Sequence, residues 1–332
     1  MIRKLVCLIC RLFAGCLSVV ERGNSLNICL TVDVESYTQN YEEHVYGGGA
    51  GLGYILETLG NSGARATFFV EALGATRWGH EPFQKLCRQI HDAGHEKGLQ
   101  IHPVVANIPG FSDTEDILWM HDYDTQLRLI EAGLDMMKKC CVSEIAIFRA
   151  GDLAANADTL RAMKHVGLLL GSNRDLDKKS TIYSEVNDLF PVRNDISSAD
   201  GITDLPVTAF RSPLPWLDGC YRHMQITALS FPEMAYGLLK MKDAGYSCAT
   251  VLMHPHEFFN VKKKEFVPNR KNRARLESLL DFIKTQPGLS IKPASECAKS
   301  VDNKAGNRPE IRLPMHLSLQ RVVEQARARI CK

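Results

Sequence analysis

Acidic, basic and imidazole side chains follow several apolar runs of the sequence, at the points where β-strands are predicted to end. Asp33 and Glu35 end the first such run, and His102 and Arg149 end two later ones. A fourth run is followed by His254, His256 and Glu257. Carboxylates and imidazoles bind divalent metals and move protons near neutral pH, so this set suits metal-assisted or general acid–base hydrolysis. One such residue alone is typical of a hydrogen-bonded strand end, but four strands ending this way favour a functional site.

The apolar runs alternate with helical patterns. Strands are predicted over residues 26–34, 66–70, 98–102, 145–149, 248–253 and 289–291, and helices over 52–59, 82–93, 124–139, 157–166, 233–244 and 273–285. Strands that alternate with helices predict a parallel sheet or barrel with crossover helices. In such folds the carboxyl ends of the strands meet at one rim, so we expect the polar residues to converge there.

Composition describes an ordinary folded chain without a strong overall field. The 332 residues are 45% hydrophobic and 23% charged, with a formal net charge of +2. This balance favours neither nucleic acid nor an anionic membrane, and we expect no nucleic-acid partner. The 11 cysteines are scattered, without repeated CxxC pairs at zinc-site spacing. We therefore expect free thiols in a reducing compartment, which indicates a cytoplasmic chain.

The N-terminal segment, residues 1–25, stands apart from this pattern. Its apolar run from Leu5 to Val20 is interrupted by Arg11. Apolar residues at helical spacing predict an amphipathic helix over residues 3–20, packed on the domain or peripherally on the inner face of a membrane. The alternative is an export signal, so an exported form stays open. The run is too short for a membrane span.

A lysine-rich stretch comes late in the chain. Lys262–Lys264 is followed closely by the basic segment Arg270–Arg273. Such a stretch is typical of a solvated loop, and its alternative role is contact with an anionic glycan or a lipid headgroup.

Six segments together resemble the NodB-like polysaccharide deacetylases. In the family's order they are Thr31–Glu35 (TVDVE), Gly63–Phe69 (GARATFF), Gly94–Gly98 (GHEKG), Phe148–Gly151 (FRAG), Asp204–Val207 (DLPV) and Leu252–His254 (LMH). The resemblance implies one distorted parallel (β/α) barrel over residues 26–297, followed by a linker and a C-terminal helix over residues 298–332. It also implies a hydrolase that removes an acetyl group from an amino sugar in a glycan or glycolipid precursor.

The resemblance further implies a mechanism and a set of roles. A divalent metal, usually zinc, would polarise the acetyl carbonyl and bind the attacking water. Asp33 would be the base and His254 the acid, and Arg149 would keep Asp33 ionised by lowering its pKa. Pro206, in the fifth matching segment, is assigned to substrate contact. Trp119 offers an aromatic face for a sugar, or for packing of its own loop.

The metal-binding pattern departs from that of the family. The family's two metal-binding histidines correspond here to Gln100 and Val104, which bind zinc poorly or not at all. Side chains alternate along a strand, so these two positions and the one between them are expected on one side. We expect a remodelled site for a divalent metal, zinc by the resemblance, with the ligands Glu35, His102 and His256. The alternative is a metal-free, catalytically inactive relative that binds carbohydrate.

Overall fold

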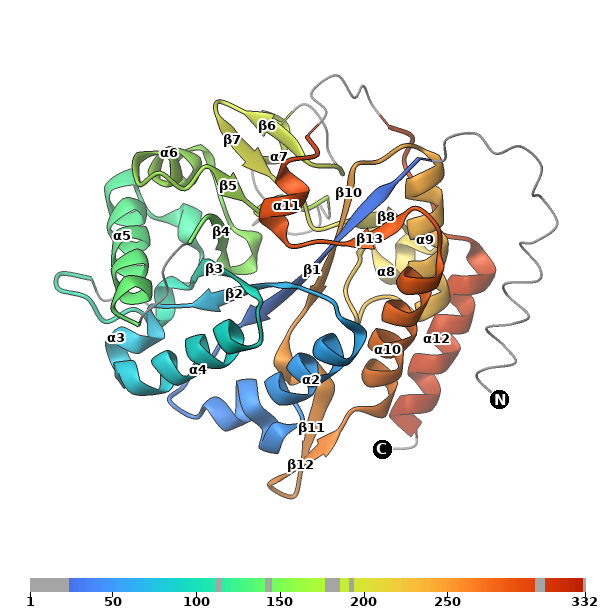
Figure 1. Cartoon of the computed structure of the whole chain (residues 1–332), viewed down its shortest axis with the longest axis horizontal. Helices are drawn as coiled ribbons and strands as arrows, with labels where there is room; N and C mark the ends of the chain where they lie inside the picture. Colours follow the sequence, from blue (N-terminus) through green and yellow to red (C-terminus); the bar gives the residue numbers. More distant parts are fainter. Residues whose placement is uncertain are drawn as a thin grey trace.

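One curled sheet contains most of the strands (Figure 1). The computed structural model describes residues 24–111, 115–140, 145–176, 186–190, 194–301 and 308–330. Within them the strand order is β10-β1-β2-β3-β4-β5-β7-β6, with β13 also paired to β1. The bounds are β1 (Leu26–Val34), β2 (Thr67–Glu71), β3 (Glu96–Ile101), β4 (Ile147–Ala150), β5 (Leu170–Gly171), β6 (Ser197–Ala199), β7 (Ile202–Asp204), β10 (Cys248–Met253) and β13 (Leu289–Ile291). Every pairing in this sheet is parallel except β6–β7, so the expected α/β class is confirmed.

Irregular chain covers the outer edge of β10. The amide of Thr208 donates to the Thr250 carbonyl at 3.2 Å, and the amide of Leu252 donates to the Met224 carbonyl at 2.9 Å. These bonds satisfy backbone groups that an open sheet edge would leave unpaired. The result is a half-barrel closed by non-strand segments, which agrees with the expected distorted barrel.

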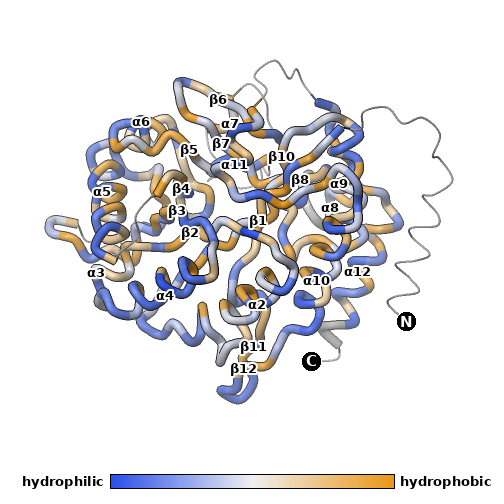
Figure 2. The backbone as a smooth tube through the Cα atoms, viewed as in Figure 1, coloured by the Kyte–Doolittle hydropathy of each residue, from blue (hydrophilic) through white to orange (hydrophobic). Residues whose placement is uncertain are grey.

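Helices surround the large sheet, and several of them cover its outer face. They are α2 (Leu52–Ser62), α3 (Gly74–Trp78), α4 (His80–Asp92), α5 (Tyr123–Lys139), α6 (Ala157–His165), α7 (Val186–Leu189), α8 (Pro215–Asp218), α9 (Phe231–Asp243), α10 (Arg270–Thr285), α11 (Ala294–Ala298) and α12 (Met315–Ile330). Helices α4 and α5 pack against β3, and α9 packs against β1. Hydrophilic and hydrophobic residues alternate along these helices (Figure 2), as expected when one face covers a sheet.

Strand β1 shows why the sequence predicts this architecture well. All of its residues except Asn27 are buried, because other strands flank it and helices cover it. A near-continuous apolar run is the signature of such a parallel strand. The predicted cap of α6 is also confirmed, since the Asn156 side chain accepts the Thr159 amide at 3.0 Å.

Strand β3 ends earlier than expected. It stops at Ile101, and Pro103 opens the short 3-10 helix η4 (Pro103–Val105). Val104 therefore lies in a turn, and the expectation that alternation along one strand extends to residue 104 is wrong. Two antiparallel strand pairs were also not predicted: β8 (Ala209–Arg211) with β9 (Tyr221–His223), and the hairpin of β11 (Phe259–Lys262) with β12 (Glu265–Pro268).

The C-terminal helix α12 packs on α9 through buried polar contacts. Arg321 Nε and Ser318 Oγ donate to Glu233 Oε1 at 3.2 and 2.8 Å, and all three side chains are buried. The N-terminal residues 3–20, predicted to form an amphipathic helix or an export signal, lie outside the described residues. Among the helices that are described, none combines the length and apolar character needed to cross a membrane.

Two helical glycines offer a matched test of this packing. A Cβ on Gly133 of α5 would lie 2.6 Å from Ile101 Cδ1, whereas a Cβ on Gly60 of α2 would meet nothing within 4 Å. Gly60→Ala should raise the free energy of unfolding by ~0.5–1 kcal/mol through helix propensity. Gly133→Ala should lower it by ~1 kcal/mol, because overpacking against β3 outweighs that gain. Urea denaturation of both variants checks this, and equal shifts of the same sign would contradict the packing described.

Candidate active site

A buried ion pair joins β1 to β4 inside the barrel. Arg149 is fully buried, and its guanidinium donates to Asp33 Oδ1. The same guanidinium donates to Thr31 Oγ1 at 3.2 Å and to both Ser172 Oγ and O, at 2.7 and 3.1 Å. Its carbon lies 4.0 Å from the centroid of the Phe69 ring. Arg149 is therefore held on every side, and it fixes the orientation of the Asp33 carboxylate.

The direction of the Asp33 pKa differs from the expectation. Burial raises the pKa of this carboxyl above its ordinary value, and the charge of Arg149 offsets only part of the rise. The expected lowering by Arg149 is therefore wrong in net direction, because the sequence does not reveal how completely Asp33 is buried. A raised pKa makes the carboxylate a stronger base.

Three side chains at the ends of β1 and β10 form a candidate cation site. One ligand atom each from Asp33, Glu35 and His254 lie within 4.8 Å of one another. His254 Nε2 lies 4.0 Å from Glu35 Oε1. Two carboxylate oxygens and one imidazole nitrogen are a donor set that divalent metals such as zinc accept. The carboxyl ends of neighbouring strands meet here, as the sequence predicted.

Glu257 fixes the His254 ring. His254 Nδ1 lies 3.0 Å from Glu257 Oε1, and the same oxygen accepts the Gln225 amide at 2.5 Å. Burial acts to lower the pKa of His254, but Glu257, together with Glu35 and Asp33, outweighs it and raises that pKa to about 9. With Nδ1 held by Glu257, Nε2 faces Asp33 and Glu35. The sequence marked Glu257 as polar but did not predict this role, which depends on the 3-10 helix η7 (Pro255–Phe258).

His102 lies beside the three-residue group, between two carboxylates. Its Nε2 is 3.3 Å from Glu35 Oε1, and its Nδ1 is 2.9 Å from Asp116 Oδ2. Burial acts to lower the pKa of His102, but Glu35 and Asp116 outweigh it and raise that pKa well above its ordinary value. Burial likewise acts to raise the pKa of Glu35, but His102 outweighs it and holds that pKa low. Both nitrogens of His102 thus face carboxylates, so His102 is placed to support Glu35.

Gln100 points its amide into the same group. Its Nε2 lies 2.5 Å from Glu35 Oε1 and 3.5 Å from Asp33 Oδ2. Its Oε1 is buried and has no hydrogen-bond partner among the described residues. A 180° rotation of the amide group would exchange its nitrogen and its oxygen. The unpaired oxygen would then face the carboxylates of Glu35 and Asp33. The amide nitrogen therefore occupies the electrostatic position that a cation would take.

Tyr37 is a contact that the sequence did not single out. Its hydroxyl donates to Glu35 Oε2 at 3.1 Å and lies 3.3 Å from both ring nitrogens of His102. The residue is 41% exposed, so its ring also borders solvent. No local pattern marks Tyr37, because the contact depends on the loop that follows β1.

The remaining predicted site residues are not part of this group. His256 is exposed, and its ring centroid is 5.0 Å from that of His254. Trp119 is half-buried in η5 (Leu118–Met120), and its carbonyl accepts the Asn156 side-chain amide at 3.3 Å. Pro206 is buried between β7 and β8. Metal binding by His256 and substrate contact by Trp119 and Pro206 stay predictions.

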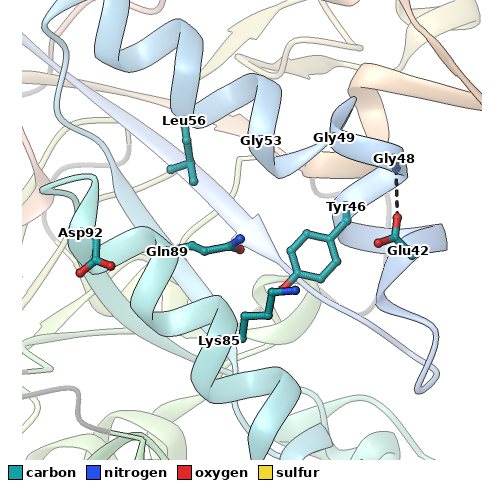
Figure 3. A pocket seen from close by; sticks show the side chains of 9 residues that line it. All are labelled: Glu42, Tyr46, Gly48, Gly49, Gly53, Leu56, Lys85, Gln89 and Asp92. Carbon is teal, nitrogen blue, oxygen red and sulfur yellow. Dashed lines mark hydrogen bonds between the residues drawn. The ribbon is translucent and has the colours of Figure 1, made fainter.

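A separate cleft of about 500 Å³ lies between α2 and α4 (Figure 3). Tyr46, Lys85 and Gln89 line it, and Glu42 accepts the Gly48 amide at 3.0 Å at one end. None of the lining residues belongs to the group around Asp33. This cleft therefore does not contribute to the candidate active site.

Comparison with known proteins bears on the fold. No family description and no curated protein matches the chain. A Mycobacterium smegmatis protein, described provisionally as a polysaccharide deacetylase, is similar with a TM-score of 0.56 and 16% identity, over 91% of this chain and 99% of that one. A 4-alpha-glucanotransferase from Thermococcus litoralis gives 0.53 and 13%, over 88% of this chain and 42% of that one. A Bacillus subtilis peptidoglycan deacetylase gives 0.44 and 13%, over 93% and 99%.

At such identities a likeness shows the fold alone. Part of the glucanotransferase has a similar fold, and its name states another reaction, so the fold does not select the chemistry. The chain has the distorted-barrel fold of the Mycobacterium smegmatis protein.

Proposed function

We propose that the protein is a metal-dependent deacetylase that hydrolyses the acetyl amide of an amino sugar in a glycan or glycolipid precursor. The observation that carries this proposal is the grouping of Asp33, Glu35 and His254 at the strand ends, with Arg149 beneath Asp33. The resemblance of the sequence segments to the NodB-like deacetylases supports the substrate class. The fold supports it only in being compatible with it.

The residues present fit a divalent metal. Glu35 Oε1 and His102 Nε2, 3.3 Å apart, would hold it, and the unpaired Oε1 of Gln100 is a further oxygen donor within the same buried group. Asp33 Oδ2 and His254 Nε2 border the same position and stay available for proton transfer. A bound divalent metal would polarise the acetyl carbonyl and lower the pKa of a bound water. Zinc fits this mixed set of oxygen and nitrogen donors.

The chain's own residues would move the protons. Asp33 Oδ1 is held by Arg149, which leaves Oδ2 to take a proton from the attacking water. The new C–O bond forms at the acetyl carbon, and the C–N bond then breaks. His254 Nε2 faces the group and would deliver a proton to the departing amine, while Glu257 holds Nδ1. Water thus adds across the amide, giving acetate and the free amine.

A second candidate function is carbohydrate binding without metal or catalysis. The observation that favours it is that the negative charges of Glu35 and Asp33 are already compensated by neighbouring side chains. The Gln100 amide nitrogen lies against Glu35 and Asp33, and His102 lies against Glu35. A cation entering the group must displace the first of these contacts, which weakens its binding.

Acetate release separates the two functions. Wild-type protein should release acetate from N-acetylated chitin oligosaccharides when zinc or cobalt is supplied. Asp33→Asn should lower the rate by about 10²–10⁴-fold, because it removes the general base. The matched control is Asp152→Asn, which makes the same substitution at an exposed residue and should keep full activity. Asp152 has a φ of 51°, a backbone conformation that asparagine tolerates. No release by wild type with either metal, together with retained glycan binding, would falsify the enzyme proposal.

Metal affinity should depend on Gln100. Gln100→His offers an imidazole nitrogen in place of an amide and should raise zinc affinity by at least about tenfold. Isothermal titration calorimetry and elemental analysis of the purified protein measure this directly. Gln100→Leu, which removes the polar end but keeps the volume, is the matched control and should not raise affinity. Equal zinc affinity in both variants would count against a metal site at this position.

The charge of His254 should depend on Glu257. In the metal-free protein His254 should keep its proton until about pH 9. Because this pKa is raised on folding, the stability it contributes is fully present below the unfolded value and is lost as the pH rises through about 9. In Glu257→Gln, His254 loses its strongest raising partner while Glu35 and Asp33 remain, so its pKa should fall below the wild-type value. Histidine titration by NMR checks both values, and an unchanged titration in the variant would refute the pairing.

A further inference from the structure

The hairpin of β11 and β12 projects from the body of the molecule (Figure 1). Its two strands of four residues are joined directly by Lys263 and Lys264. At ~3.3 Å per residue, the turn lies ~13 Å beyond the start of β11. Figure 2 shows that the tip is hydrophilic. The hairpin therefore places the two lysines of its turn at a distance from the barrel.

The residues of the turn are unfavourable for its backbone. Lys263 and Lys264 have φ values of 50° and 69°, so both lie in the left-handed region. A two-residue hairpin turn with both φ values positive prefers Asn-Gly, because side chains with a Cβ are strained there. Two lysines at these positions lower stability relative to Asn-Gly. Strain of this kind is a reason to look for a role of the side chains themselves.

Three consecutive lysines at the tip point their charge away from the part of the chain that the structure describes. Lys262, Lys263 and Lys264 are exposed, and none makes a hydrogen bond or ion pair with a residue that the structure describes. Glu265 lies opposite Lys262 in the register without forming an ion pair with it. The tip thus presents a concentrated positive charge, although the whole chain carries only +2.

The base of the hairpin is packed firmly. The rings of Phe259 and Phe266 meet edge to face at 5.5 Å, and Phe259 is buried against Gly47. Gly47 allows this contact, since a Cβ there would lie 2.5 Å from the Phe259 ring. β11 continues directly from η7, which carries Glu257, the partner of His254. The lysines are therefore held in a defined place relative to the candidate active site.

We propose that Lys262, Lys263 and Lys264 form a binding site for an anionic polysaccharide, which they hold through its carboxylate or phosphate groups. Naming this polymer as the substrate rests on the proposed deacetylase function; the binding site does not. The tip lies too far from His254 to touch the reacting amide, so it contacts a separate part of an extended chain. An exposed cationic turn suits charges spread along a polymer.

A lipid surface fits the hairpin less well. Stable binding to a membrane surface usually adds buried apolar or aromatic side chains to the attraction between basic residues and anionic lipids. Here both phenylalanines lie in the base, and Val261, 55% exposed, is the one large apolar side chain of the hairpin that is strongly exposed. The charged tip favours a hydrated polymer.

The test uses Lys263→Asn with Lys264→Gly in the full chain. This double variant removes two charges and relieves the turn, so its melting temperature should rise while its binding falls. The probe is polygalacturonate, measured by calorimetry at low and at high salt, with neutral chitin oligosaccharides alongside. The matched control is Lys138→Gln with Lys139→Gln, which removes the same charge from the exposed end of α5.

Wild type should bind polygalacturonate at low ionic strength and release it as salt is added. The hairpin variant should bind about tenfold more weakly, as expected for the loss of two exposed charges, and the α5 variant should bind as wild type does. Equal losses in both variants would show an effect of net charge and overturn the proposal. So would absent binding, or lysine-dependent binding to phosphatidylserine vesicles without binding to polygalacturonate. The experiment measures binding and not catalysis, so it tests the lysine site even if the deacetylase proposal is wrong.

Discussion

The contact between Asp33 and Arg149 is the constraint on which the candidate site depends. Removing two charges from water is costly unless their mutual attraction and further hydrogen bonds compensate. Thr31 and Ser172 supply those bonds, and the Phe69 ring covers the guanidinium. β1 and β4 are thereby tied across two intervening strands. This tie places one oxygen of Asp33 against Arg149 and leaves the other facing the strand ends.

Around this ion pair, carboxylates and histidine rings alternate. Glu35 lies between His102 and His254, and each histidine has a second carboxylate behind it, Asp116 or Glu257. Such an arrangement holds Glu35 ionised and keeps both rings oriented. It also determines how readily a metal enters, since a cation competes with the Gln100 amide for the same oxygens. The catalytic and the non-catalytic proposals therefore differ in one respect, namely whether a metal ion or the Gln100 amide occupies the position between Glu35 and Asp33.

The sequence predicted the parts of this structure whose signals are local. Continuous apolar runs marked β1 and β10, and Asn156 marked the start of α6, because burial on both faces and capping leave short-range patterns. The convergence of Asp33, Arg149 and His254 followed from parallel topology. The β11–β12 hairpin escaped prediction because its turn is Lys-Lys rather than a glycine-containing pair. Asp116 and Tyr37 escaped because loop geometry alone brings them to His102 and Glu35.

The position of a bound metal is the most direct measurement of the central claim. Crystals grown with zinc and measured on both sides of the zinc absorption edge would locate the ion independently of any activity. A metal-dependent site predicts one strong anomalous peak at Glu35 and His102, bordered by Asp33 and His254, with the Gln100 amide displaced or turned toward it. Full zinc saturation with no peak in this group, and with Gln100 still on Glu35, would contradict the claim.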